Sequence, residues 1–184
     1  LCGFPKDSFY YYQAEWTEAP VLHLFPHWNL DCAVGEAVDL WAYTNCASVE
    51  LWLNGVSQGK RERKPFGKVQ WEVPYEAGTL EAVGYDAKGE EQIRRSIQTT
   101  GVAEKIELSL ASVGVEADGH AVAIINVTAS DAEGRSVPTA DNEVEFEVSE
   151  SAVVLGVGNG NPTSHEPEQA PRRRLFNGAA QLII

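Results

Sequence analysis

Residues 38–55, VDLWAYTNCASVELWLNG, contain the pattern that decides the fold of this chain. Aliphatic or small side chains occupy every second position, first in residues 38–43 and again in residues 49–54. A period of two is typical of β-strands that bury one face. The pair Asn54-Gly55 at the end of the second run favours a type I′ hairpin turn, which requires positive φ at both central residues. The stretch therefore predicts antiparallel β structure.

The same alternation continues along the chain in both directions from this stretch. Further strands are expected at residues 69–73, 80–85, 92–99, 105–110, 121–130, 142–148, 152–158 and 175–184. Turn sequences separate them, and residues 99–103 form a linker between two blocks of strands. Short strands with frequent turn signals are typical of immunoglobulin-like domains. The sequence predicts a mostly β chain with two immunoglobulin-like β-sandwiches, at residues 31–100 and 101–184.

Residues 1–30 have a different character, because a helix is predicted at residues 4–16. Pro5 suits the first turn and Asp7 or Ser8 can cap it. Three aromatic residues fall on one face of this helix: Phe9, Tyr12 and Trp16. A lone helix of about 10 residues is marginal in water, so this face needs a partner. The chain also contains no methionine, and we interpret it as a fragment whose helix packs on another part of a longer protein.

The charge balance excludes some classes of partner. The 184 residues include 27 acidic and 14 basic side chains, a net charge of −13. Nucleic acids and anionic membranes attract positive surfaces, so neither is an expected partner. No apolar run approaches the roughly 20 residues of a membrane-spanning helix. Arg172–Arg174 is the one basic run, and an ion-paired or solvated strand edge is favoured there over an anion site.

Cysteine and histidine spacing gives little support for a disulfide scaffold or a metal site. Three cysteines are too few for a disulfide framework, although Cys32 and Cys46 can pair if their strands are adjacent. His23 and His27 are four residues apart, but Pro26 between them argues against a metal-binding helix. Packing roles are favoured for both histidines, and no metal site is predicted.

Residues 156–161, GVGNGN, have some similarity to a dinucleotide-binding loop. Asn161 stands where the third glycine is needed, and Pro162 follows where a helix should begin. A tight transition from strand to loop explains the segment better. A cation held by Asn161 or Glu166 is a weaker alternative, and no cofactor is predicted.

Three groups of motifs resemble proteins of glycoside hydrolase family 2, the β-galactosidase family. The first group resembles the end of the catalytic (β/α)8 barrel: GFPKD (3–7), YYYQ (10–13), EWT (15–17), PVLHL (20–24) and PHWN (26–29). The second resembles the β-sandwich that follows the barrel: TNC (44–46) and VELWLNG (49–55). The third resembles the C-terminal immunoglobulin-like domain: LGVGNGNP (155–162), SHEP (164–167) and RRLFNG (173–178). Residues 1–30 are accordingly interpreted as the last helix and linker of the barrel.

The resemblance implies retaining hydrolysis of β-glycosides by two glutamates on the barrel, about 5–5.5 Å apart. Both are expected upstream of Leu1, so no catalytic residue is assigned in this chain, and Glu15 and Glu18 are interpreted as solvated surface carboxylates. The expected partner is the upstream barrel of the same polypeptide, with contacts in a homo-oligomer as a further option. The resemblance also implies that the second sandwich continues past Ile184, which predicts an unpaired strand edge there. A periplasmic or secreted location fits the resemblance.

Two sets of residues are candidates for functional contacts. Contact with the substrate or the barrel is expected from Phe4, Lys6, His27 and Trp28. Exposed aromatics on the sandwich are expected from Trp41, Tyr43, Trp52 and Trp71. Such a surface can pack on the barrel, which is favoured, or hold sugar rings as a carbohydrate-binding module. A cell-surface adhesion module is a further alternative.

Overall fold

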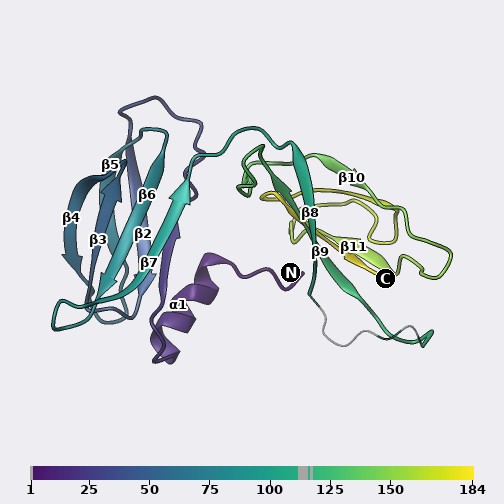
Figure 1. Cartoon of the computed structure of the whole chain (residues 1–184), viewed down its shortest axis with the longest axis horizontal. Coiled ribbons are helices and arrows are strands. Elements are labelled where there is room, and N and C mark those ends of the chain that lie inside the picture. Colours follow the sequence, from purple (N-terminus) through teal and green to yellow (C-terminus); the bar gives the residue numbers. More distant parts are fainter. Residues whose placement is uncertain (1, 112–115, 117) are drawn as a thin grey trace. The chain divides into compact units, whose positions relative to one another are not determined.

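The structure is a computed structural model that describes residues 2–111, 116 and 118–184. It is mostly β, as predicted, with one α-helix and several antiparallel sheets among the described residues (Figure 1). The chain divides into two compact units: Pro5–Thr99 is one, and Thr100–Ile184 together with the N-terminal residues up to Phe4 is the other. Within the described part of the chain, no helix is both long enough and apolar enough to cross a membrane.

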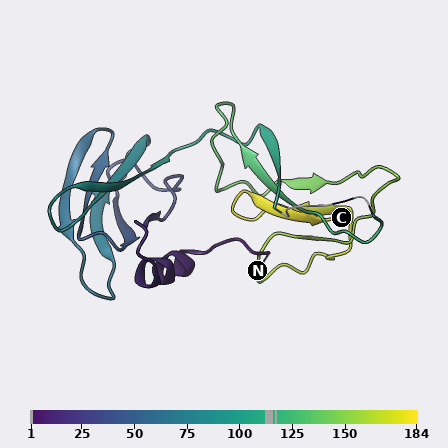
Figure 2. The same ribbon diagram turned by 60° about the horizontal axis from the view of Figure 1, so that its bottom comes forward.

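The unit Pro5–Thr99 consists of a helix and two antiparallel sheets (Figures 1 and 2). Its elements are α1 (Asp7–Trp16), β1 (Leu22–Phe25), β2 (Ala37–Thr44), β3 (Ser48–Leu53), β4 (Val56–Glu62), β5 (Val69–Pro74), β6 (Thr79–Tyr85) and β7 (Glu91–Gln98). One sheet has the strand order β1-β2-β5 and the other has the order β4-β3-β6-β7.

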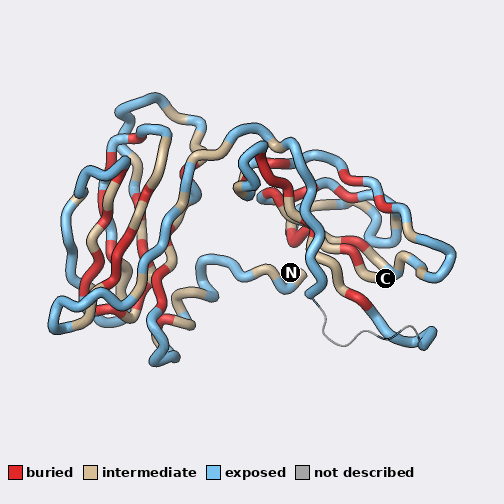
Figure 3. Tube along the Cα trace, viewed as in Figure 1, coloured by how far each residue is buried: buried red, intermediate tan, exposed pale blue. Residues whose placement is uncertain are grey.

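The inward-facing residues of both sheets form one hydrophobic core. Leu40 on β2, Leu51 on β3, Trp71 on β5 and Leu80 on β6 are all fully buried. Each such side chain contributes roughly 2 kcal/mol through its removal from water. Buried and exposed positions alternate along these strands (Figure 3), which is the pattern that the period of two predicted.

Asn54 and Gly55 join β3 to β4 with positive φ angles of 49° and 80°. The predicted hairpin turn is therefore confirmed. The Asn54 side chain also accepts a hydrogen bond from the Thr79 backbone N–H at 2.8 Å, which ties the turn to the start of β6.

The helix begins later than the sequence indicated, and its predicted cap is wrong. The Phe9 N–H donates to the Lys6 carbonyl at 2.8 Å, so the first turn closes on Lys6. Asp7 and Ser8 therefore lie inside the helix, where their side chains cannot cap it. Lys6 occupies the N-cap position without a side-chain hydrogen bond.

The second unit contains two further antiparallel sheets. Its strands are β8 (Lys105–Leu110), β9 (Ile124–Ser130), β10 (Glu143–Glu145), β11 (Gly156–Gly158), β12 (Arg172–Arg174) and β13 (Ala179–Ile183). The larger sheet has the order β11-β13-β9-β8, and the smaller sheet pairs β10 with β12. The core between them includes Val127, Val144, Leu175 and Ala180.

The predicted unpaired edge at Ile184 is wrong. The strand β13 pairs with β11 on one side and with β9 on the other. The Ile184 N–H donates to the Ala123 carbonyl at 3.0 Å, and the Ala123 N–H donates back at 2.8 Å. The outer strands of this sheet are β8 and β11.

Candidate functional site

One face of α1 is fixed to the outside of the sheet β1-β2-β5. The Tyr10 ring stacks on His23 of β1 with a centroid separation of 3.8 Å. Asp7 Oδ1 lies 2.8 Å from His23 Nε2, and the Tyr11 ring meets Tyr43 of β2 edge-on at 5.2 Å. The helix therefore has a defined orientation on this sheet.

An ion pair strengthens this attachment at the C-terminal end of α1. Arg63 Nη2 donates to Glu15 Oε1 at 2.5 Å, and both side chains are at least four-fifths buried. The interpretation of Glu15 as a solvated carboxylate is therefore wrong, because the fold brings Arg63 from the end of β4 over the helix. Glu18 is exposed, as expected.

The other face of α1 is exposed and aromatic. The exposed fractions are 51% for Phe9, 50% for Tyr12 and 79% for Trp16. The Tyr12 and Trp16 rings contact each other at a centroid distance of 4.9 Å. We call Phe9, Tyr12 and Trp16 the aromatic face of α1.

The predicted aromatic candidates on the strands lie in different places. Trp41 and Tyr43 are half-buried on the outer side of β2. Phe25 contacts both of them, at 5.6 Å and 4.7 Å between centroids, and Lys68 Nζ lies over the Trp41 ring. Trp52 is half-buried on the outer side of β3, in the other sheet. Because the two sheets enclose one core, their outer sides face away from each other, and these residues do not form one platform.

Two of the predicted contact residues are buried instead of lying on the surface. Trp71 is fully buried because it shares the inward phase of β5 with Val69 and Val73, and its Nε1 donates to the Gly59 carbonyl at 3.0 Å. Trp28 is 1% exposed, and its Nε1 donates to the Glu76 carbonyl at 2.8 Å. The prediction that Trp28 and Trp71 form surface contacts is therefore wrong, because both rings belong to the hydrophobic core.

The other predicted contact residues are more accessible. Lys6 and His27 are exposed and Phe4 is half-buried. A role for them in contact with substrate or barrel stays a prediction. Cys32 and Cys46 are free thiols, so the bridge between them is not formed.

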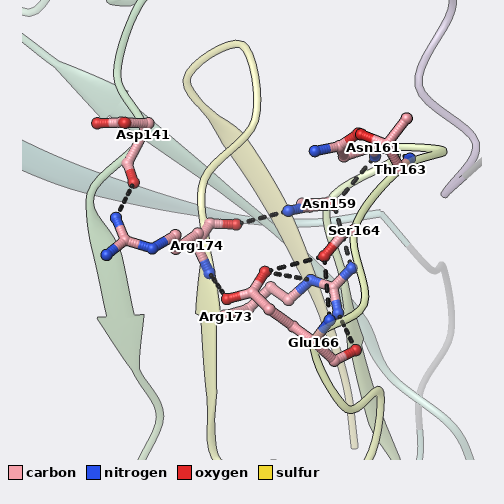
Figure 4. Close-up of polar contacts among 8 residues, drawn as sticks. All are labelled: Asp141, Asn159, Asn161, Thr163, Ser164, Glu166, Arg173 and Arg174. Atoms are coloured by element: carbon pink, nitrogen blue, oxygen red, sulfur yellow. Dashed lines mark hydrogen bonds and ion pairs between the residues drawn. The ribbon is translucent and has the colours of Figure 1, made fainter.

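A buried polar cluster surrounds Arg173 in the second unit (Figure 4). Arg173 lies on β12 and is only 4% exposed. Its Nη1 donates to the Glu166 carbonyl at 2.9 Å, and its Nη2 donates to Asn159 Oδ1 at 3.2 Å. Its Nε lies 3.6 Å from Glu166 Oε2, so the carboxylate balances the guanidinium charge.

Further hydrogen bonds connect the other residues of this cluster. Glu166 accepts hydrogen bonds from the Ser164 hydroxyl at 3.1 Å and from the Arg174 N–H at 3.3 Å. The Asn159 side chain, itself buried, donates to the Arg174 carbonyl at 2.9 Å. A buried charge is tolerated when it is paired and hydrogen bonded. The cluster therefore fastens the loop after β11 to β12, and the paired arginine does not form an open anion site.

Metal binding finds no support among the described residues, where no group of three or more histidine, cysteine, aspartate or glutamate side chains could hold an ion. The sequence offered Glu166 as a possible cation ligand. Its carboxylate instead contacts the Arg173 guanidinium and the Ser164 hydroxyl. The segment 156–161 forms β11 and the loop that follows it, as the strand-to-loop interpretation expected.

Comparison with known proteins gives two matches to family models. Residues 106–184 match glycoside hydrolase family 2 C-terminal domain 5, and residues 35–93 match a domain of unknown function. A β-galactosidase from Bacteroides ovatus is 40% identical over 100% of this chain and 22% of that protein. A β-glucuronidase from Formosa agariphila is 36% identical over 87% of this chain and 16% of that protein. The chain thus spans about a fifth of the length of these relatives.

Solved structures agree with these matches. A β-glycosidase from Bacteroides vulgatus has a TM-score of 0.92 at 35% identity, covering 99% of this chain and 23% of that protein. A family 2 member from Bacteroides cellulosilyticus also has a TM-score of 0.92, at 34% identity, covering 99% of this chain and 27% of that protein. The chain belongs to glycoside hydrolase family 2, in which it matches the C-terminal region, and this confirms the resemblance of its motifs.

Sequence reasoning missed two features of these sites. The strand β1 was not predicted, because the apolar run Leu22–Phe25 is short and is followed by Pro26. The burial of Arg173 was not predicted either. No local signal marks it, because β12 consists of three arginines and only the structure shows that the middle one points inward.

Proposed function

We propose that this chain is a non-catalytic accessory part of a retaining glycosidase that cleaves β-galactosides, and that it supports the catalytic barrel. The observation that carries the proposal is the aromatic face of α1, which is exposed while the opposite face is fixed to a sheet. Large exposed apolar groups held in a fixed position usually mark a contact with another surface. In a protein of this family, the expected surface is the barrel of the same polypeptide.

The positions of the carboxylates support an accessory role. A retaining enzyme uses two carboxyl groups about 5–5.5 Å apart on either side of the scissile bond. Two largely buried carboxylates of this chain, Glu15 and Asp131, are instead each held by an arginine. Glu15 pairs with Arg63 at 2.5 Å and Asp131 pairs with Arg135 at 2.6 Å. The first pair holds α1 in place, and the second pair holds the turn after β9.

The relatives support the choice of β-galactosides over β-glucuronides as the substrate class. The β-galactosidase relative is 40% identical to this chain and the β-glucuronidase relative is 36% identical. The difference is small, so β-glucuronides are the competing class and belong in every activity measurement on the parent protein.

The proposal can be tested by Trp16→Ala in the full-length protein. Removal of a large aromatic side chain from an interface typically costs about 3 kcal/mol or more. We expect a fall in the midpoint of thermal unfolding of several degrees, on the order of 5 °C, and a lower kcat/KM on an aryl β-galactoside. Val56→Ala is the matched control, because Val56 is 64% exposed at the hairpin between β3 and β4.

The control variant should leave the unfolding midpoint and kcat/KM within error of the unaltered protein. If Trp16→Ala is equally silent, the aromatic face of α1 does not pack on the barrel and the supporting role must be abandoned.

A further inference from the structure

A hollow lies at one end of the sheet β4-β3-β6-β7. The first residue of β3, Ser48, pairs with the last residues of β4 and β6. Figure 1 shows the end of β4 and the turn between β6 and β7 at this end of the sheet. Between them, Ala47 and Ser48 have short side chains and form the floor of a hollow of about 770 Å³. Residues 60–63 and 86–89 form its walls, and we call this hollow the basic cleft.

The walls of the basic cleft are rich in positive charge. Its lining contains two acidic residues, Glu62 and Asp86, and four basic residues, which are Lys60, Arg61, Arg63 and Lys88. The whole chain has 27 acidic and only 14 basic side chains, so the cleft has the opposite charge balance. Asp86 Oδ1 is occupied within its own turn, because it accepts the backbone N–H groups of Lys88 at 2.8 Å and Glu90 at 2.9 Å. The cleft therefore attracts anions.

The basic groups of the cleft are only partly compensated. Lys60 and Lys88 form no ion pair with any residue that the structure describes. Lys60 Nζ lies 3.7 Å from the centroid of the Tyr85 ring, which holds the ammonium group in place without neutralising it. Arg63 pairs with Glu15 through Nη2, and its Nε has no hydrogen-bond partner among the described residues. A buried donor without an acceptor is uncommon in proteins and indicates a group that the chain itself does not supply.

We propose that the basic cleft binds an oligosaccharide that carries acidic groups, which are carboxylates or sulfates. Lys60 and Lys88 stand on opposite walls and bind these groups, while the sugar rings lie over Ala47 and Ser48. The volume of the cleft falls within the range of about 300–1,000 Å³ that is typical of ligand sites. A second hollow of about 410 Å³ adjoins it at Arg63, so more than one sugar ring has room.

The choice of an oligosaccharide over other anions rests on the proposed function, in which the parent protein cleaves glycosides. It does not depend on which glycoside is cleaved. The basic cleft shares no residue with the aromatic face of α1, so the two sites can be tested separately.

The proposal can be tested by calorimetry with trigalacturonate, a sulfated galactose trisaccharide and neutral maltotriose. The unaltered full-length protein is compared with Lys88→Ser and Lys64→Ser at low ionic strength, where charges are screened least. Lys64→Ser is the matched control, because Lys64 is exposed next to the cleft wall but does not line the cleft. We expect the unaltered protein to bind at least one acidic trisaccharide and not maltotriose. Lys88→Ser should weaken this binding about fivefold or more, and Lys64→Ser less than about twofold.

Three results would overturn the proposal. Binding of neither acidic trisaccharide would show that the cleft is not an oligosaccharide site. Equal losses in the two variants would show attraction by net charge alone. Binding of citrate as tightly as the acidic trisaccharides would show an anion site without sugar recognition. The proposed function is judged separately, because Trp16→Ala tests it through thermal unfolding and hydrolysis.

A second measurement locates the ligand without any substitution. Lysine amines of the full-length protein are acetylated with and without the acidic trisaccharide that binds, and the modified peptides are separated by mass. We expect the ligand to slow acetylation of Lys60 and Lys88 at least about threefold, because it occupies their amines, and to leave Lys64 unchanged. Unchanged rates at Lys60 and Lys88 would place the ligand elsewhere in the protein and contradict the proposal.

Discussion

Arg173 is a buried positive charge in a chain whose net charge is −13. It is one of three consecutive arginines on β12, and only its side chain points inward. Its guanidinium group holds Glu166 and Asn159 at once, so the loop between β11 and β12 is fastened at one point. Breaking a buried ion pair by removal of one partner leaves the other charge without compensation.

Arg173→Ala should therefore lower the free energy of unfolding by about 3 kcal/mol. This is at the low end for buried pairs, because the Glu166 side chain is 32% exposed. Arg172→Ala is the matched control, since Arg172 is exposed on the same strand, and its effect should stay within about 0.5 kcal/mol. Denaturant unfolding of the full-length protein measures both. Equal effects of the two substitutions would contradict the assigned role of Arg173.

Asp131 is a second buried charge, with 1% of its side chain exposed. It accepts hydrogen bonds from the Gly101 N–H at 3.0 Å and from the Arg135 N–H and Nε at 2.8 Å each. Burial raises the pKa of the Asp131 carboxyl, but the hydrogen bonds from Arg135 and Gly101 outweigh it and hold the pKa well below its usual range. The carboxylate therefore joins the start of the second unit to the turn after β9.

This lowered pKa makes stability depend on pH in a defined direction. A depressed pKa in the folded state adds stability above the unfolded-state pKa of about 3.9, and this stability is lost as the pH falls below that value. The free energy of unfolding of the unaltered protein should fall more steeply between about pH 5 and pH 2 than that of Asp131→Asn. Glu133→Gln, an exposed neighbour in the same turn, should keep the original slope. Identical slopes in all three proteins would refute the assignment.

At the scale of elements, the turn before β13 lies very close to the backbone of Val137. Gly178 has a φ of 73°, and a Cβ atom at this residue would lie 2.1 Å from the Val137 carbonyl oxygen. The Gly178 N–H also donates to the Ala140 carbonyl at 3.0 Å, so the turn cannot move away without loss of that bond. Both the backbone conformation and the space require glycine here.

Gly178→Ala should lower the free energy of unfolding by about 3 kcal/mol, the sum of backbone strain and steric overlap. Gly134→Ala separates the two causes. Gly134 has a φ of 80° but nothing within 4 Å of the added Cβ, so only the strain of about 1 kcal/mol is expected. Equilibrium unfolding of both variants gives the difference. A cost for Gly178→Ala no larger than that for Gly134→Ala would show that no steric overlap exists.

The sequence predicted most of the elements in the first unit because its strands alternate cleanly. The alternation in residues 38–54 predicted β2 and β3, because one face of each strand is buried. The pair Asn54-Gly55 predicted the turn between β3 and β4. The strand β1 was missed because it is stabilised by pairing with β2, from Leu22 with Thr44 to Phe25 with Trp41, and a short apolar run does not show its partner. The predicted helix cap was wrong for a local reason. The first turn closes on Lys6, one residue before Asp7, so Asp7 and Ser8 lie inside the helix.

The sites were harder to predict than the strands, because burial depends on what lies across the sheet. Alternation placed Trp41 and Trp52 outward and Trp71 with the aliphatic residues of its strand, yet all three were counted as surface candidates. Trp28 lies outside any strand, so no period indicated its burial. The pairing of Glu15 with Arg63 joins residues 48 apart in the sequence, which no local pattern shows.

At the scale of the whole molecule, the chain contains two units, each with its own hydrophobic core. Aromatic rings and the Glu15–Arg63 ion pair hold α1 on the first unit, and the aromatic face of α1 remains exposed. Under the proposed function, this exposed face contacts the catalytic barrel, and the chemistry takes place elsewhere in the polypeptide.

The most direct test of this account is hydrolysis of an aryl β-galactoside and an aryl β-glucuronide by the full-length protein and by residues 1–184 alone. We expect the full-length protein to cleave the β-galactoside with the higher kcat/KM, and residues 1–184 to cleave neither substrate. Turnover by residues 1–184, or a full-length protein inactive on both substrates, would contradict the account.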